Sequence, residues 1–259
     1  MKKFILSIIV SWVSITAFSQ RGFHLGASGA FNFNMIFPQH NYRTLAPFAE
    51  PFVRTSEMDY KATWGGNGGI CLGYGFHKNW SLQLEAQYNS TGQKYEDNFV
   101  GPAVIPQGTI GAGGDRVNVK RNVRLSYVQI PLMAKFVSTK GYVAKAFVMF
   151  GPQFGIRTTA KEEVFIADNF YADTVFSAKE KFNSFDMGFA IQGGVELYAN
   201  DNLYFDIGLS VYQGFMDINT KEVRYWYSQN DSDYTPSYNF RVGILAGVHY
   251  IIGDGRSDY

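Results

Sequence analysis

The sequence has a single cysteine, Cys71, and it lacks the long apolar runs of helical membrane proteins. One cysteine excludes an intramolecular disulfide framework, and Cys71 fits the role of a small buried apolar residue. After the first twenty residues no apolar run approaches the roughly eighteen residues that a spanning helix needs, although 46% of the chain is hydrophobic. A membrane-embedded form would therefore have to be a closed β-barrel, which satisfies every backbone hydrogen bond without water.

Charge is also scarce. Charged residues make up 17% of the chain and the formal net charge is +1, whereas soluble domains carry roughly 25% charged residues. The sequence shows no clustered basic face, so a nucleic-acid partner is not expected. Aromatic residues reach the same 17%, with 17 Tyr and 23 Phe.

The first residues have the pattern of a secretory signal peptide. Lys2 and Lys3 precede a short apolar run, and Ala17 and Ser19 form a small-x-small cleavage site before Gln20. No cysteine stands at that junction, so a lipoprotein anchor is not expected. The predicted organisation is a signal peptide over residues 1–19 and one outer-membrane β-barrel domain over residues 20–259.

The stretch from Tyr238 to Ile252 alternates between apolar and small or polar residues. A strand points successive side chains to opposite faces, so this pattern predicts a β-strand with one wholly apolar side. About nine to eleven residues suffice to cross a bilayer obliquely, and this stretch is longer. The apolar face carries Tyr238, Phe240, Val242, Ile244, Ala246, Val248, Tyr250 and Ile252.

The same alternation recurs seven more times upstream. The predicted strands are 22–34, 68–77, 80–89, 125–136, 142–157, 183–198, 202–213 and 238–252. Turns at Lys78-Asn79, Lys140-Gly141 and Asn200-Asp201 alternate with long loops at about 35–67, 92–122, 158–181 and 214–236. Short periplasmic turns and longer extracellular loops are typical of outer-membrane barrels.

The predicted fold is therefore all-β: an eight-stranded antiparallel up-and-down transmembrane β-barrel with four long extracellular loops and three short periplasmic turns. It would lie in the outer membrane of a Gram-negative bacterium, with both termini in the periplasm. The alternative is a lipocalin-like soluble barrel, which would turn its apolar face inward and its polar face to water. Here the polar face is mostly Gly, Ser, Asn, Gln and Tyr, which suits a narrow packed interior better than a wetted surface.

Two stretches resemble a known family. The segment from Leu125 to Phe136 contains a Tyr-x-x-x-Pro-Leu pattern, and the segment from Phe150 to Gly155 contains Gly-Pro. Both are similar to the PorT-like outer-membrane β-barrels of Bacteroidetes, a porin-family group. The resemblance implies an eight-stranded barrel and, in some members, a role linked to secretion across the outer membrane or to gliding.

The C-terminal end departs from that family pattern, because residues 253–259 follow the last strand. Such barrels usually end at an aromatic residue that serves as a signal for the barrel-assembly machinery. Either Tyr259 or Tyr250 would serve here, and we favour Tyr250, with the rest as a short tail.

Charged residues on the inferred inward face are balanced in sign. Because the interior of an eight-stranded barrel is just wide enough for side chains to fill, they predict a structural charge layer rather than a channel. Counting from the turns, we expect Lys135 and Lys145 to be near neighbours across one hairpin, and Glu196 and Asp206 across another. We expect Lys145 to face Glu196, and Arg157 to pair with Asp186; the alternative is separate hydration of each charge in a wet lumen. The eight residues are Glu85, Asp186, Glu196 and Asp206 with Lys135, Lys145, Arg157 and Arg241.

Aromatic residues beside the short turns predict a periplasmic-side girdle at the membrane interface. Tyr204 also lies there but has lumenal parity. Pro131 and Pro152 fall at matching heights on neighbouring strands, where a bulge or gap in the ladder is expected. The girdle residues are Phe76, Trp80, Phe136, Tyr142, Tyr198 and Tyr250.

No catalytic, cofactor-binding or metal-binding residues are predicted. His24, His77 and His249 map near the periplasmic end without an inferable nucleophile, and the loop acids Asp231 and Asp233 lack the closing Glu of a calcium loop. The leading hypothesis is a non-enzymatic barrel whose loops form an interaction surface for an outer-membrane protein or a surface ligand. The alternatives are a small-solute porin and an outer-membrane enzyme acting on lipids or proteins.

Overall fold

The computed structural model describes residues 22–37, 53–54, 59–100, 103–105, 108–110, 116–138, 140–141, 143–166, 174–221 and 236–252. The predicted signal peptide and the predicted tail lie outside the described residues. In the described part of the chain, no helix is both long and apolar enough to cross a membrane.

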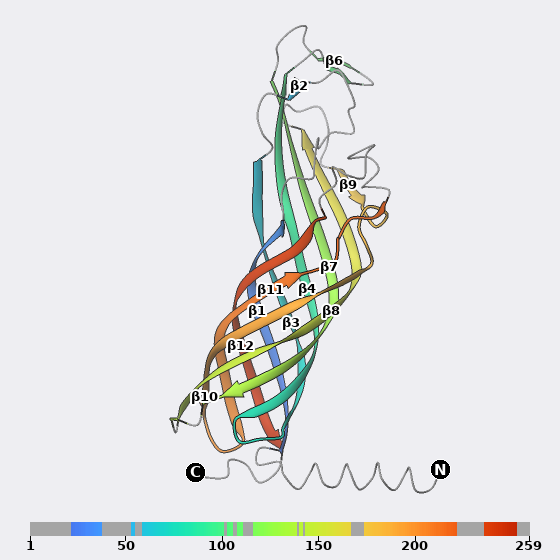
Figure 1. Cartoon of the computed structure of the whole chain (residues 1–259). Coiled ribbons are helices and arrows are strands. Elements are labelled where there is room, and N and C mark those ends of the chain that lie inside the picture. Colours follow the sequence, from blue (N-terminus) through green and yellow to red (C-terminus); the bar gives the residue numbers. More distant parts are fainter. Residues whose placement is uncertain are drawn as a thin grey trace, which may run out of the picture.

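Eight antiparallel strands close into a barrel in which each strand pairs with its neighbours in chain order and the last pairs with the first (Figure 1). In the closing pair, Phe23 lies opposite Ile252 and Phe37 lies opposite Tyr238. The predicted closed eight-stranded barrel is confirmed, and the final strand has the predicted bounds. The strands are β1 (Gly22–Phe37), β3 (Asp59–Gly75), β4 (Trp80–Val100), β7 (Arg116–Val137), β8 (Ala144–Ile166), β10 (Phe185–Tyr198), β11 (Leu203–Gly214) and β12 (Tyr238–Ile252).

Four short strands accompany the barrel. β2 (Val53–Arg54) pairs with β4, β9 (Thr174–Ser177) pairs with β8, and β5 (Ala103–Ile105) pairs with β6 (Gly108–Ile110). All of them belong to the connections that cross from one barrel strand to the next at the same end.

The apolar side chains of the barrel strands point outward. Ile70 is 69% exposed, Leu209 61% and Ile244 62%, whereas the alternate positions on the same strands are buried and mostly polar. A soluble barrel would reverse this arrangement, because exposed apolar surface is costly in water. The outward belt of Phe, Leu, Ile and Val is therefore the lipid-facing surface.

The two ends of the barrel differ. The connections 76–79, 138–143 and 199–202 lie at one end, which we call the turn end; Gly22 pairs with Gly75 there, so the first described residue is at this end too. Gly141 has a φ of 102°, a left-handed conformation that favours glycine in this turn. The opposite end is called the projecting end.

At the projecting end four adjacent strands run beyond the barrel, and Figure 1 shows β4, β7 and β8 rising past the other strands. The predicted loops were therefore wrong over residues 59–67, 92–100, 116–122 and 158–166, which are strand. The prediction depended on an alternating apolar face. A strand needs such a face only where it meets lipid, so the strand residues beyond the lipid gave no signal. The projection is defined here as residues 59–63, 90–100, 116–126 and 158–166.

Irregularities in the ladder lie near the base of the projection. The β3–β4 register shifts between Ala62 and Asn67, and the β7–β8 register shifts next to Ser126, where Thr158 is the extra residue. Lower in the barrel, the β7–β8 pairing skips Leu132 and Met133, which lie opposite Pro152 and Gly151. Proline cannot donate a ladder hydrogen bond, which explains this gap near the two prolines.

Candidate functional site

The barrel interior is the candidate site because it gathers nearly all buried charges of the described strands. These side chains come from the inward positions of β4, β7, β10, β11 and β12, where strand alternation turns polar residues away from lipid. They form two groups, one near the turn end and one near the projecting end.

The turn-end group centres on an ion pair. Lys135 Nζ lies 2.8 Å from Glu196 Oε1, and both side chains are 1% exposed. The Tyr198 hydroxyl donates to the other Glu196 oxygen at 2.6 Å. The Lys135 ammonium also lies 4.9 Å from the Phe147 ring centroid and 5.1 Å from that of Tyr204, within cation–π range. This cluster joins β7 to β10 over the inner face of β8, which lies between them.

An imidazole connects this cluster to the wall formed by β3. His249 Nε2 lies 2.9 Å from Asp206 Oδ2, and its Nδ1 lies 3.5 Å from Cys71 Sγ. The Tyr204 ring stacks on the imidazole with centroids 4.6 Å apart. A thiol, an imidazole and a carboxylate in this order resemble a nucleophilic relay. All three are buried and the imidazole is covered, so the arrangement acts as packing.

A ladder of amides runs up the inner face of β4. Glu85 accepts hydrogen bonds from Gln83 Nε2 at 2.7 Å and from Gln87 Nε2. The chain continues from Asn67 to Gln87 Oε1 at 2.7 Å and from Asn32 to Asn67 Oδ1 at 2.6 Å. The Glu85 carboxylate is thus held by neutral donors.

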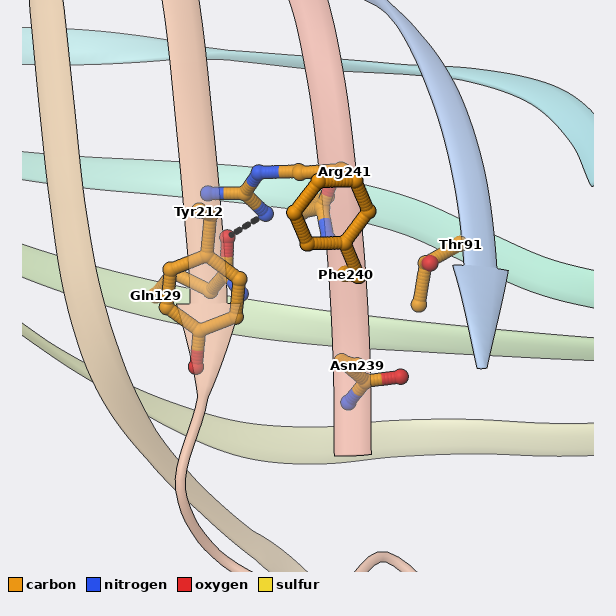
Figure 2. A pocket seen from close by; sticks show the side chains of 7 residues that line it. Thr91, Gln129, Tyr212, Asn239, Phe240 and Arg241 are labelled. Carbon is orange, nitrogen blue, oxygen red and sulfur yellow. Dashed lines mark hydrogen bonds between the residues drawn. The ribbon is translucent and has the colours of Figure 1, made fainter. Parts of the chain in front are cut away.

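The second group crosses the lumen near the projecting end. Arg241 donates to Gln129 Oε1 at 2.6 Å and to Gln153 Oε1 at 2.8 Å, so β12 is tied to β7 and β8 on the opposite wall. Figure 2 shows the guanidinium beside the Tyr212 ring, 4.6 Å from its centroid. The small pocket between Arg241 and Thr91 is too narrow to hold a water molecule. The lumen is therefore filled at this level.

Asp186 lies just beyond this arginine. Its Oδ2 accepts hydrogen bonds from Asn239 Nδ2 at 2.9 Å and from the Tyr212 hydroxyl at 3.0 Å. Arg157, predicted as its partner, instead donates to the backbone oxygens of Asn183 and Lys179. The prediction failed because the segment before β10 supplies carbonyl acceptors to the Arg157 guanidinium.

Lys145 lies opposite Glu196 in the β8–β10 register, as we expected. Its ammonium also lies 5.2 Å from the Tyr198 ring centroid. The structure shows Glu196 in an ion pair with Lys135. Lys135 pairs in register with Met149, so the two lysines are not cross-strand neighbours as we expected. The β7–β8 connection is longer than the two-residue turn that the count assumed.

The predicted girdle residues mostly face outward. Phe76, Phe136 and Tyr250 are exposed, and Trp80 packs edge-to-face on Phe136 with centroids 5.1 Å apart. Tyr198 is half-buried because its hydroxyl turns to Glu196. Tyr204 is buried, as its lumenal parity indicated, and Tyr142 lies outside the described residues.

The projection has ion pairs of its own. Arg121 Nε lies 2.7 Å from Glu162 Oε1, and Lys181 Nζ lies 2.9 Å from Glu162 Oε2. Burial alone raises the pKa of the Glu162 carboxyl, but the two cations outweigh it and hold that pKa below its ordinary value. On the opposite face, hydrogen bonds to Glu96 and Asp59 raise the pKa of Lys61.

Several residues of the interior were missed by sequence reasoning. Gln129, Gln153 and Asn239 hold Arg241 and Asp186, yet neutral amides give no signal beyond their inward parity. Within the described ranges no group of three His, Cys, Asp or Glu side chains is placed to hold a metal ion.

Comparison with known proteins agrees with this architecture. Residues 18–220 match the family described as outer membrane protein beta-barrel domain. No curated protein matches the chain. Among solved structures, Neisserial surface protein A has 14% identity and a TM-score of 0.42, with 89% of this chain and 97% of that chain covered.

Two further structures are similar at the same level. OprG from Pseudomonas aeruginosa has 10% identity and a TM-score of 0.35, covering 89% of this chain and 96% of its own. Ail of Yersinia pestis, in complex with the heparin analogue sucrose octasulfate, has 10% identity and a TM-score of 0.32, covering 88% and 99%. The family match spans most of the chain. The chain therefore belongs to the family described as outer membrane protein beta-barrel domain.

Proposed function

We propose that this protein is a non-conducting outer-membrane barrel that acts by binding, with the projection as its interaction surface. The observation that carries the proposal is the filled lumen combined with the length of β4, β7 and β8. Arg241 crosses the interior to Gln129, and the buried Lys135–Glu196 pair lies over the inner face of β8 at a second level, while the strands continue beyond the lipid belt. A barrel with a filled interior has no passage for solutes. The projection offers surface to a partner.

The projection would face the outside of the cell and the turn end the periplasm. The placement of the short connections at one end supports this orientation. A Cys71→Ser protein carrying Lys94→Cys should react with a membrane-impermeant maleimide on intact cells, whereas one carrying Lys140→Cys should react only after lysis. The reverse labelling pattern would contradict the proposed orientation.

Conductance measurement tests the closed lumen. Purified protein in planar bilayers should show no steady single-channel current, because two layers of bonded side chains block the interior. A stable, reproducible conductance would instead favour the small-solute porin. Lipase and protease assays on the same preparation test the enzymatic alternative, for which the buried Cys71, His249 and Asp206 offer no accessible nucleophile.

The partner would be a component of secretion or gliding machinery, as the resemblance of residues 125–136 and 150–155 to PorT-like barrels implies. Crosslinking from Lys94 or Lys161, followed by purification from native membranes, should recover an outer-membrane or surface protein. The matched control is crosslinking from Lys78 and Lys140 at the turn end, which should not recover the same protein.

A further inference from the structure

The outward face of the four long strands changes character at the base of the projection. The last apolar positions on β4, β7 and β8 are Tyr88, Val128 and Ile156, all exposed toward lipid. The next outward positions carry hydroxyls, Ser90 and Ser126 among them. Beyond them the outward side chains are charged, with Lys61, Lys94, Lys120, Arg124 and Lys161 as cations and Asp59, Glu96 and Glu163 as anions.

Four of these cations form two like-charged pairs across neighbouring strands. Lys61 pairs in register with Lys94, and Arg124 pairs in register with Lys161. Like charges directly opposite each other destabilise an antiparallel pair. Such an arrangement is favourable only where anions, from the protein or from outside it, neutralise the charges.

The acidic residues of this face neutralise the other cations only in part. Glu163 Oε2 lies 3.2 Å from Arg124 Nη2, and Glu96 binds Lys61 at 2.7 Å and Lys120 at 3.8 Å. Lys94 and Lys161 are exposed, and within the described part of the chain neither has a carboxylate within ion-pair distance. Their charges are therefore available to an external ligand.

Arg124 and its register neighbour Lys161 lie just above the layer of lipid headgroups. From Val128 to Arg124 the strand advances about 13 Å, at about 3.3 Å per residue, and the strand tilt reduces this to about 10 Å along the membrane normal. Lys94 lies opposite Asn122, two residues further along β7, and is therefore about 15 Å above the apolar belt. The headgroup layer begins at the end of the apolar belt and is roughly 5–8 Å thick on each side. Lysine and arginine side chains can reach back toward it along their apolar stems.

We propose that Lys94, Arg124 and Lys161 form a binding site for the phosphate groups of anionic lipid headgroups in the leaflet around the projecting end. The site lies on the outward face of the wall and is reached from the lipid. This proposal does not depend on any protein partner of the projection. It adds ion pairs with lipid phosphates to the apolar contact between the barrel and its membrane.

Native mass spectrometry of the detergent-purified protein tests the site, with phosphatidylglycerol and phosphatidylcholine as probes. The wild-type protein should retain phosphatidylglycerol in preference to phosphatidylcholine. In a Lys94→Gln/Lys161→Gln variant that preference should fall about fivefold for each lysine removed. The control variant Lys78→Gln/Lys140→Gln has the same charge change at the turn end and should keep the preference for phosphatidylglycerol. The charge-conserving variant Lys94→Arg/Lys161→Arg should keep it too.

Three results would overturn the proposal. One is equal lipid preference in the wild type and the Gln variant, with the Gln variant still folded by its heat-dependent electrophoretic mobility. Another is an equal loss in the turn-end control, which would indicate net charge alone. The third is full displacement of phosphatidylglycerol by inorganic phosphate at matched ionic strength, which would identify a site for free phosphate.

Discussion

Lys135 and Glu196 form an ion pair from strands that are not adjacent, since β8 lies between β7 and β10. The lysine passes over the inner face of β8 and reaches the carboxylate at 2.8 Å inside the closed lumen. The pair therefore links strands that the backbone ladder does not join.

Removing only the cation of this pair should be costly. Lys135→Met would leave the Glu196 carboxylate buried without its partner, which typically costs about 3–5 kcal/mol. Lys135→Met/Glu196→Gln should recover most of that loss, because no uncompensated charge remains. Denaturant unfolding in detergent micelles measures both, with exposed Lys140→Met as the control. A double variant no more stable than the single one would contradict the pairing.

Opening the lumen should require changes at both levels. Arg241→Ser and Lys135→Ser should each remain non-conducting, because the buried side chains of the other group still fill the interior. The combined variant should show small single-channel currents in planar bilayers. Current from either single variant would mean that one level alone closes the barrel.

Acid should loosen the projection before the barrel. The folded-state pKa of Glu162 is held below its ordinary value, so the stabilisation by Arg121 and Lys181 is complete above the unfolded-state pKa of about 4.3. It is lost as the pH falls through the lower, folded-state pKa. Hydrogen-exchange protection factors for residues 158–166 should therefore drop below about pH 4. In Glu162→Gln they should be lower at neutral pH and nearly flat with pH.

Cys71 should be inert in the folded protein. Its thiol is buried and lies 3.5 Å from His249 Nδ1. A maleimide reagent should label it only after denaturation, and the added mass of a polymer-linked maleimide on a gel measures the labelled fraction. A His249→Ala variant should label faster, because the imidazole that covers the thiol is gone. Rapid labelling of the folded wild type would show that solvent reaches the turn-end lumen.

The barrel could be predicted from sequence because most lipid-facing residues are apolar and most of their neighbours are small or polar. The strand from Tyr238 to Ile252 shows this alternation, with Leu245 and Ile251 as inward apolar exceptions, and its predicted bounds are those of β12. The projection could not be predicted this way. On the outward face of residues 90–100 the apolar signal ends, although the ladder to β7 continues to Val100.

The sequence could not predict which side chains pair with each other inside the barrel, for a different reason. Parity indicates which residues face inward, and it placed Lys135, Glu196 and Asp186 in the interior. Pairing depends on strand tilt and on the true length of each connection. The count from the turns set Lys145 beside Lys135, whereas the register places Met149 there. Asp186 pairs in register with Gly155, and Arg157 binds backbone oxygens of the segment before β10, which side-chain parity does not reveal.

The extension of β4, β7 and β8 has a mechanical consequence. The β4–β7 pairing runs without a register shift from Gln87 in the transmembrane wall to Val100 in the projection. A force applied to this part of the projection would therefore be transmitted along the paired strands to the part of the barrel that lies in lipid. The projection is a direct extension of the transmembrane strands that the bilayer holds in place.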